Sequence, residues 1–147
     1  MSLVGETIRN IELSEQLGEG GMGEVYLGVD TVLGRKVAVK VIRASMRPDR
    51  RAKARFVREA RLLSQLEHSN ICRIYEFIEG DDADFIVLEM VPGRTLTDEL
   101  DEGLSYEAKL RIAIQVADAL RAAHAISVVH RDLKPDNIMV DPDGLVR

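Results

Sequence analysis

Chemically active side chains are concentrated in the segment 130–137, His-Arg-Asp-Leu-Lys-Pro-Asp-Asn. A carboxylate, an ammonium and an amide lie within six residues at Asp132, Lys134 and Asn137. Asp132 can accept the proton of a substrate hydroxyl, Lys134 can neutralise charge on a phosphoryl group in flight, and Asn137 can hold a divalent metal ion. A chance turn rich in Asp, Pro and Asn is the alternative, and eight successive positions that agree with one catalytic pattern argue against it.

A second candidate is the glycine-rich segment 17–25, in which Gly18, Gly20 and Gly23 stand in G-x-G-x-x-G order. Glycines let the backbone turn tightly and approach a phosphate, whose oxygens accept hydrogen bonds from exposed backbone N–H groups. Taken alone, the motif fits a flexible hairpin turn equally well. A dinucleotide-binding fold needs a helix directly after the glycines, and the alternating residues that follow them exclude it.

Lys40 and Glu59 form a third candidate. Lys40 ends the stretch Val-Ala-Val-Lys at 37–40 and can point to the side of the glycine loop, where an ammonium binds phosphate oxygens. A solvent-facing lysine is the alternative, although Ala38 on the same face argues mildly against it. Glu59 flanks the apolar stripe of a predicted helix, from which it can reach Lys40. Its alternative partner is Arg55, one helical turn earlier.

The elements that must position these residues change character along the chain. Alternating apolar residues predict strands in the first part, with Val37, Val39 and Val41 on one face. Apolar residues at helical spacing follow, and after them come two more predicted strands on either side of the acidic turn 80–82. Pro92 then marks a boundary between the predicted strands and the predicted helices. The predicted strands are 11–17, 24–29, 36–42, 72–79 and 85–90, and the first predicted helix is 49–67. After this boundary, Thr95-x-x-Asp98 predicts a capping box for a short helix, and Ser105 the N-cap of a helix over 106–125.

Composition narrows the class of protein. An apolar fraction of 46% in 147 residues excludes a disordered chain. A net charge of −5 disfavours contact with nucleic acid or an anionic membrane, and no apolar run is long enough to cross a bilayer. The single cysteine, Cys72, indicates a reducing compartment. Segment 47–61 carries seven basic and two acidic residues, so a nucleic-acid-binding module that binds duplex DNA in a salt-dependent way is a rival interpretation.

Together these segments resemble a protein kinase. The glycine loop, Val-Ala-Val-Lys, the helix glutamate and His-Arg-Asp-Leu-Lys-Pro-x-Asn occur in the order of that family and at suitable spacings. Lys134 in the last motif is similar to serine/threonine kinases, and the segment 20–26, Gly-Gly-Met-Gly-Glu-Val-Tyr, resembles their bacterial branch. The resemblance covers the chain after the first ten residues.

The resemblance implies an ATP site and a catalytic centre. Asp132 would be the catalytic base, Lys134 the contact to the γ-phosphate and Asn137 a Mg²⁺ ligand. For the ATP phosphates it implies contact with the backbone of Gly18, Gly20 and Gly23, and binding of the α- and β-phosphates by Lys40 in an ion pair with Glu59. For adenine it implies apolar contacts on both faces of the ring from Leu17, Val25, Ala38 and Met139. Leu88 would occupy the gatekeeper position, and backbone groups of Glu89 and Val91 would form hydrogen bonds with the base.

The implied fold is α+β, with a small lobe of antiparallel sheet plus one helix over 1–91. The first helices and the catalytic loop of a large helical lobe follow over 92–147. The family's Asp-Phe-Gly segment, which carries a metal-binding aspartate, does not occur before Arg147. We therefore expect a truncated catalytic domain: the parent protein phosphorylates serine and threonine hydroxyls of proteins, and the 147 residues alone do not.

The expected setting is cytoplasmic, with ATP and Mg²⁺ as cofactors, protein substrates, and no nucleic acid or membrane contact by this segment. The helical stripe Leu110, Ala113, Ala117 and Leu120 lacks partners to cover it, which predicts self-association. The alternative function is a non-catalytic nucleotide-binding or interaction module with a kinase-like fold. ATP titration with and without Mg²⁺ distinguishes the two.

Overall fold

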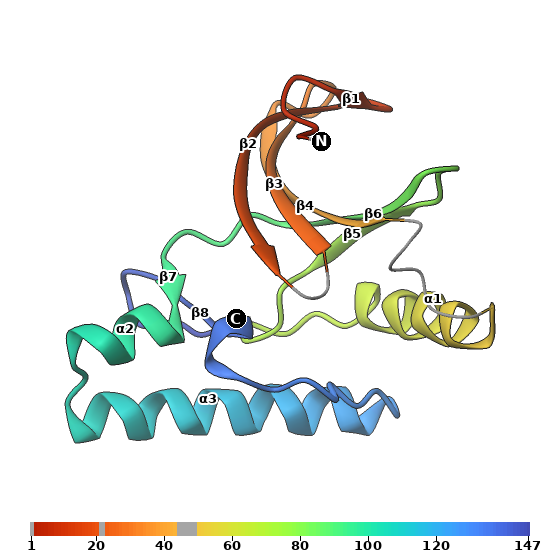
Figure 1. Cartoon of the computed structure of the whole chain (residues 1–147). Coiled ribbons are helices and arrows are strands. Elements are labelled where there is room, and N and C mark those ends of the chain that lie inside the picture. The colour runs from red at the N-terminus through yellow and green to blue at the C-terminus, as the bar shows by residue number, and fades with distance from the viewer. Residues whose placement is uncertain (1, 21–22, 44–49) are drawn as a thin grey trace. The chain divides into compact units, whose positions relative to one another are not determined.

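The computed structural model describes residues 2–20, 23–43 and 50–147 (Figure 1). The chain divides into two compact units. We call the first the sheet unit, which comprises the residues up to Ser64 together with Ile74–Met90. The second, the helical unit, comprises Gln65–Arg73 and Val91–Arg147. The short segment Gln65–Arg73 thus groups with the later part of the chain.

The sheet unit is built on one curled antiparallel sheet with the strand order β1-β2-β3-β4-β6-β5. The strands are β1 (Thr7–Ile8), β2 (Ile11–Gly20), β3 (Gly23–Asp30), β4 (Arg35–Arg43), β5 (Ile74–Ile78) and β6 (Ala83–Glu89). An antiparallel sheet with one helix, as the kinase resemblance implied, is confirmed. The two-residue strand β1 was not predicted, because so short a segment has no measurable alternation.

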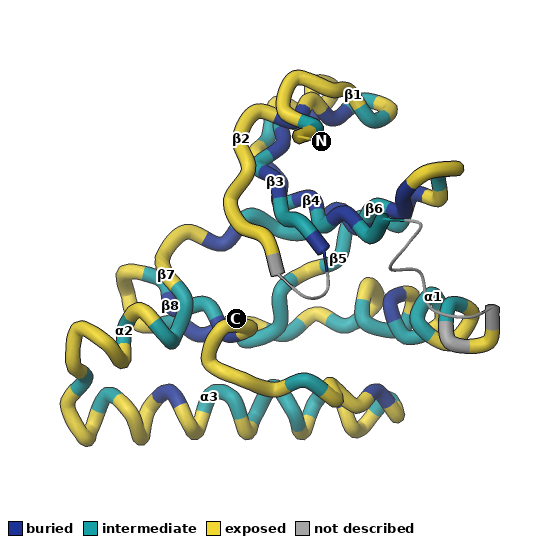
Figure 2. The backbone as a smooth tube through the Cα atoms, viewed as in Figure 1, coloured by how far each residue is buried: buried dark blue, intermediate teal, exposed yellow. Residues whose placement is uncertain are grey.

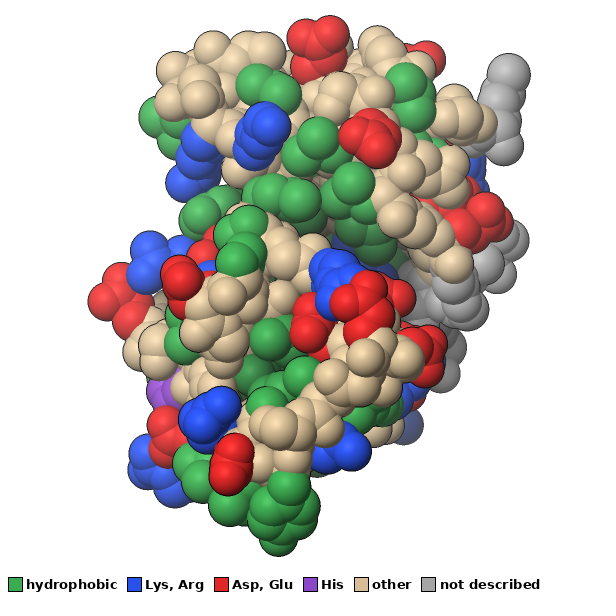
Figure 3. All heavy atoms as spheres, turned by 90° about the vertical axis from the view of Figure 1, so that its left-hand side faces the viewer, with side chains coloured by type: hydrophobic (Ala, Val, Ile, Leu, Met, Phe, Trp, Pro, Cys, Tyr) green, Lys and Arg blue, Asp and Glu red, His purple; other side chains and the backbone are tan. Residues whose placement is uncertain are grey.

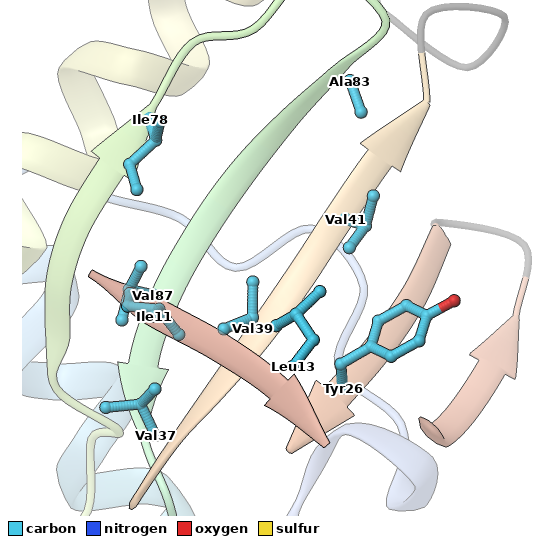
Figure 4. Close-up of a cluster of buried hydrophobic side chains, with 9 residues drawn as sticks. All are labelled: Ile11, Leu13, Tyr26, Val37, Val39, Val41, Ile78, Ala83 and Val87. Carbon is cyan, nitrogen blue, oxygen red and sulfur yellow. The ribbon is translucent and has the colours of Figure 1, made fainter. Parts of the chain in front are cut away.

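The alternation of valines in β4 determines which face of the sheet is buried. Val37, Val39 and Val41 have at most 1% of their surface exposed, since successive side chains of a strand point to opposite faces. They pack with Leu13 of β2 and Tyr26 of β3 in the hydrophobic cluster drawn in Figure 4. Burying a side chain of this size contributes about 1.5–3 kcal/mol, so this face anchors the sheet.

Helix α1 (Arg50–Ser64) packs against the same sheet. Phe56 meets Phe77 of β5 edge to face, with ring centroids 6.1 Å apart, and Ala60 is buried. The predicted helix over 49–67 is confirmed in type, but it ends at Ser64, whose hydroxyl donates to the carbonyl of Arg61. Asp49, its predicted first residue, lies outside the described residues.

The helical unit contains two helices whose N-termini are capped as predicted. Helix α2 (Leu96–Glu102) has a complete capping box between Thr95 and Asp98. Helix α3 (Tyr106–Ala125) has Ser105 as N-cap, and its bounds agree with the predicted 106–125. The remaining elements are the 3₁₀ turn η2 (Pro135–Asn137) and the paired strands β7 (Arg94–Thr95) and β8 (Met139–Val140).

Helix α3 buries one side and exposes the other. Ile112 packs with Ile138, Val140 and Val146 in a small core of the helical unit. On the opposite side much of the helix is exposed (Figure 2), including Leu110, which keeps 51% of its surface. Hydrophobic side chains also gather at the lower edge of the face seen in Figure 3, where the first turns of α3 lie. Among the described residues, no helix combines the length and apolar character needed to span a bilayer.

Candidate active site

Strand register brings one set of predicted site residues together on one face of the sheet. Val25 of β3 lies opposite both Gly18 of β2 and Lys40 of β4. Directly opposed residues of neighbouring strands project to the same side, so these three positions share a face. It is the face opposite Val39, which is buried in the core.

Leu88 continues this face on β6. It lies opposite Ala38 of β4, two residues before Lys40. Glu89, the last residue of β6, lies opposite Val37. Leu17 on β2 keeps 43% of its surface exposed. The sheet unit therefore carries the sequence-predicted residues Leu17, Gly18, Gly20, Gly23, Val25, Ala38, Lys40, Glu59, Leu88 and Glu89, whereas Val91 and Met139 belong to the helical unit.

The glycine segment forms the end of the β2–β3 hairpin. Gly20 pairs with Gly23, and the two positions between them lie outside the described residues. At Gly23, φ is +123° and a Cβ would lie 2.1 Å from the carbonyl oxygen of Val41. Only glycine allows this close approach of two backbones. Register shifts in β2 before Gly18 bring it opposite Val25, and such bulges bend a strand locally.

A charged network lies just behind this turn. Arg43 donates from Nε to Oε1 of Glu24 (2.7 Å) and from Nη2 to Oε2 (3.0 Å), and the hydroxyl of Tyr26 also donates to Glu24. The guanidinium of Arg43 and then the hydroxyl of Tyr26 lower the pKa of Glu24 from 4.5 to about 2. The network joins the start of β3 to the end of β4, so it stiffens the sheet next to the glycine turn.

Lys40 and Glu59 both belong to the sheet unit and are both partly buried. Glu59 lies on α1 between Phe56 and Ala60, which face the sheet. It is thus on or near the packed side of the helix, as the sequence predicted. The ion pair between Glu59 and Lys40 stays a prediction.

The helical unit brings Asp132, Lys134 and Asn137 together. The amide nitrogen of Asn137 donates to the backbone carbonyl of Asp132 (2.8 Å) and to its Oδ2 (3.1 Å). Nζ of Lys134 lies 3.7 Å from the same Oδ2. The backbone N–H of Asp132 donates to Nδ1 of His130 (3.3 Å), and Arg131 between them has φ of +62°. One ammonium and one amide therefore converge on a single carboxylate.

Local structure holds this loop in place. Pro135 begins the 3₁₀ turn η2, whose end is marked by a hydrogen bond from the N–H of Ile138 to the carbonyl of Pro135 (3.2 Å). Ile138 is buried and accepts a hydrogen bond from the N–H of Leu96 (2.8 Å). The hydroxyl of Thr97 donates to Asp136 (2.5 Å). The loop is therefore fastened to α2 on both sides of Asn137.

A polar network that the sequence did not predict fastens the chain after the loop. Oε1 of Gln115 on α3 accepts from the N–H of Val146 (3.0 Å) and from the side chain of Asn70 (2.8 Å). The other amide atom of Gln115 donates to the carbonyl of Gly144 (2.9 Å). Nearby, His68 and Asp118 are 3.1 Å apart. Hydrophobic periodicity does not indicate contacts between polar residues that are far apart in the sequence, so no local pattern predicted these contacts.

The donor atoms around Asn137 suit a hard divalent cation. Its amide nitrogen points to Asp132, which leaves the amide oxygen, Oδ1, as the ligand atom that it presents. Magnesium prefers oxygen ligands such as carboxylate and amide oxygens. Asn137, the metal ligand implied by the resemblance, therefore offers an atom of the kind that Mg²⁺ accepts, and its binding of the ion stays a prediction.

Comparison with known proteins identifies the family. The model of the protein kinase domain matches residues 11–147. Serine/threonine-protein kinase pkn2 of Myxococcus xanthus is 45% identical over 125 residues, which are 84% of this chain and 15% of the relative. Serine/threonine-protein kinase PrkC of Bacillus subtilis is 38% identical, with 99% of this chain and 23% of the relative covered. The chain thus spans less than a quarter of these relatives. Because the family model covers nearly all of its residues, the chain belongs to the protein kinase family.

Proposed function

We propose that the protein containing these 147 residues transfers the γ-phosphoryl group of ATP to serine or threonine hydroxyls of protein substrates. The observation that carries the proposal is the convergence of Lys134 and Asn137 on the carboxylate of Asp132. The names of the relatives, all bacterial serine/threonine-protein kinases, support the choice of acceptor.

Phosphoryl transfer at this loop needs no reactant besides ATP and the substrate hydroxyl. The substrate hydroxyl oxygen forms a bond to the γ-phosphorus, the bond from this phosphorus to the bridging oxygen breaks, and ADP leaves. Asp132 takes the hydroxyl proton, and Lys134 offsets the negative charge on the transferred group. Asn137 would hold Mg²⁺, which supplies charge neutralisation on the phosphates when bound.

We propose that the residues which the resemblance assigns to ATP bind this nucleotide. Lys40, supported by Glu59, would bind the α- and β-phosphates under the glycine loop. Val25, Ala38 and Leu88 share one face of the sheet with Lys40, which suits an apolar platform for adenine. Leu17 and Met139 would complete the platform, and backbone groups of Glu89 and Val91 would bond the base. Consistent with the need for ATP, we assign the domain to the cytoplasm.

The decisive experiment compares Asp132→Asn with wild type in the parent enzyme. We expect the kcat for phosphorylation of a serine peptide to fall about 10²–10⁴-fold. Affinity for ATP with Mg²⁺, measured by calorimetry, should stay within about twofold, because Asp132 acts on the hydroxyl. The matched control is Asp143→Asn, an exposed change in the turn 141–144.

Two results would contradict the proposal. Full activity of Asp132→Asn would remove the assigned base. A wild-type protein that binds ATP but transfers no phosphate would favour the alternative function, a non-catalytic nucleotide-binding or interaction module. The 147 residues contain no Asp-Phe-Gly segment, so we expect this stretch by itself to be inactive.

For the 147-residue chain we also propose self-association through the outer side of α3. Tyr106, Leu110 and Ile114 keep 81%, 51% and 62% of their surfaces exposed. Covering each would be worth about 1.5–3 kcal/mol. Light scattering should therefore give a mass above that of a monomer at micromolar concentration, and Leu110→Glu should restore the monomer mass.

A further inference from the structure

Lys53, in the first turn of α1, reaches a buried carboxylate on the sheet. Its Nζ lies 3.1 Å from Oδ2 of Asp84 on β6 and 3.0 Å from Oε1 of Glu79, which directly follows β5. The Asp84 side chain has 4% of its surface exposed, whereas Glu79 has 67%. The contact with Asp84 therefore differs in kind from a surface ion pair.

A carboxylate as buried as Asp84 needs its charge compensated. Transfer of an ionised carboxylate out of water is costly unless it is paired and hydrogen-bonded. Asp84 is also held rigidly, since it lies opposite Ile42 in the ladder between β4 and β6. The ammonium of Lys53 thus contacts a fixed point of the sheet. The carboxylates of Glu79 and Asp84 raise the pKa of Lys53, so it stays charged at neutral pH.

This contact limits how α1 can rotate. Lys53, Phe56 and Ala60 follow one another at intervals of three and four residues, which places them on one side of the helix. Phe56 and Ala60 make the apolar contacts of this side of the helix. The ion pair adds a charged contact between the first turn of α1 and a fixed carboxylate of the sheet. Glu59 lies six residues after Lys53, about 9 Å along the helix axis, so a rotation at Lys53 moves Glu59 as well.

We infer that Lys53 is a positioning residue of this enzyme: its ion pair with Asp84 fixes the rotation of α1 and so holds Glu59 for phosphoryl transfer. The inference rests on the proposed function. Lys53 itself contacts neither ATP nor substrate in this proposal; it acts by positioning Glu59.

The test measures peptide phosphorylation by the parent enzyme at a temperature where every variant is folded. Lys53→Met should lower kcat/KM about tenfold, since small misplacements of catalytic groups cost one to two orders of magnitude. Lys53→Arg keeps the charge and should recover activity to within about threefold of wild type. Arg58→Met, which removes an exposed cation from the same helix, should stay within about twofold.

Two further variants separate positioning from mere stability. Lys53→Met/Asp84→Asn removes both charges of the pair, so activity should stay about tenfold low even where its thermal stability exceeds that of Lys53→Met. In a Glu59→Gln background, Lys53→Met should change kcat/KM less than about twofold, because both changes act on one step.

Three results would overturn the inference: activity of Lys53→Met equal to that of Arg58→Met, activity that returns together with stability in the double variant, or an undiminished tenfold loss in the Glu59→Gln background. The proposed function fails separately, when wild type itself transfers no phosphate.

Discussion

Replacement of Glu24 by glutamine tests the effect of the charge beside the glycine turn. Glutamine has the shape of the carboxylate but no charge, so Arg43 and Tyr26 lose their ionised partner. The Glu24 side chain has 15% of its surface exposed. Its pKa falls from 4.5 to about 2 in the folded chain. With about 1.4 kcal/mol for each pKa unit, this fall corresponds to about 3 kcal/mol of stability at neutral pH.

The sign of the pH dependence follows from the lowered pKa. A carboxyl group with a lower pKa in the folded state stabilises that state fully above its unfolded value, here 4.5. This stability is lost as the pH falls from 4.5 toward about 2, because the unfolded chain then binds the proton more readily. Glu24→Gln should therefore be about 2–3 kcal/mol less stable than wild type at neutral pH, with a difference that shrinks in acid.

Urea unfolding followed by circular dichroism, at one protein concentration and several pH values, measures this difference. The matched control is Glu12→Gln, an exposed position on β2, which should change stability by less than about 0.5 kcal/mol. A loss for Glu24→Gln that has the same size at about pH 3 as at about pH 7 would refute the assignment to charge. So would a loss no larger than that of Glu12→Gln.

Three substitutions in the helical unit have equally specific expected outcomes. Gly93→Ala should lower the free energy of unfolding by more than about 2 kcal/mol, because φ is +119° and a Cβ would lie 2.1 Å from the carbonyl oxygen of Val140. Gly103→Ala, with φ of +94° and open space around the added Cβ, should lower the free energy of unfolding by about half as much. Thermal melts of both variants measure this difference, and equal losses of stability would exclude the steric explanation. Gln115→Ala should destabilise by about 2 kcal/mol and speed amide exchange at Val146, whose N–H donates to it; unchanged exchange would contradict this.

Local patterns predicted the elements of this chain well because their causes lie within a few residues. The valines of β4 alternate, and the buried face followed from that alternation alone. Thr95 and Ser105 satisfy backbone N–H groups within the next turn, so both helix starts were predictable. The end of α1 was predicted less well, since Leu66 continues the helical spacing beyond Ser64, where the helix stops.

The polar loop 130–137 was predictable for a similar reason. Asp132, Lys134 and Asn137 are neighbours in the chain, so their side chains meet within one short loop, which contacts with α2 then hold in place. The positions of Gly18, Val25 and Lys40 on one face needed the strand register as well. That register depends on shifts in β2 that the residue pattern does not reveal.

By itself the sequence determined the kinds of elements, their caps and the composition of the polar loop, because these depend on interactions between near neighbours. The tertiary structure alone decided which distant polar residues meet. Lys53 contacts Asp84, which is 31 residues away in the sequence, and Asn70 contacts Gln115, which is 45 residues away. Such pairs depend on how strands and helices are ordered in space, and desolvation of a carboxylate like that of Asp84 occurs only once the sheet has formed around it.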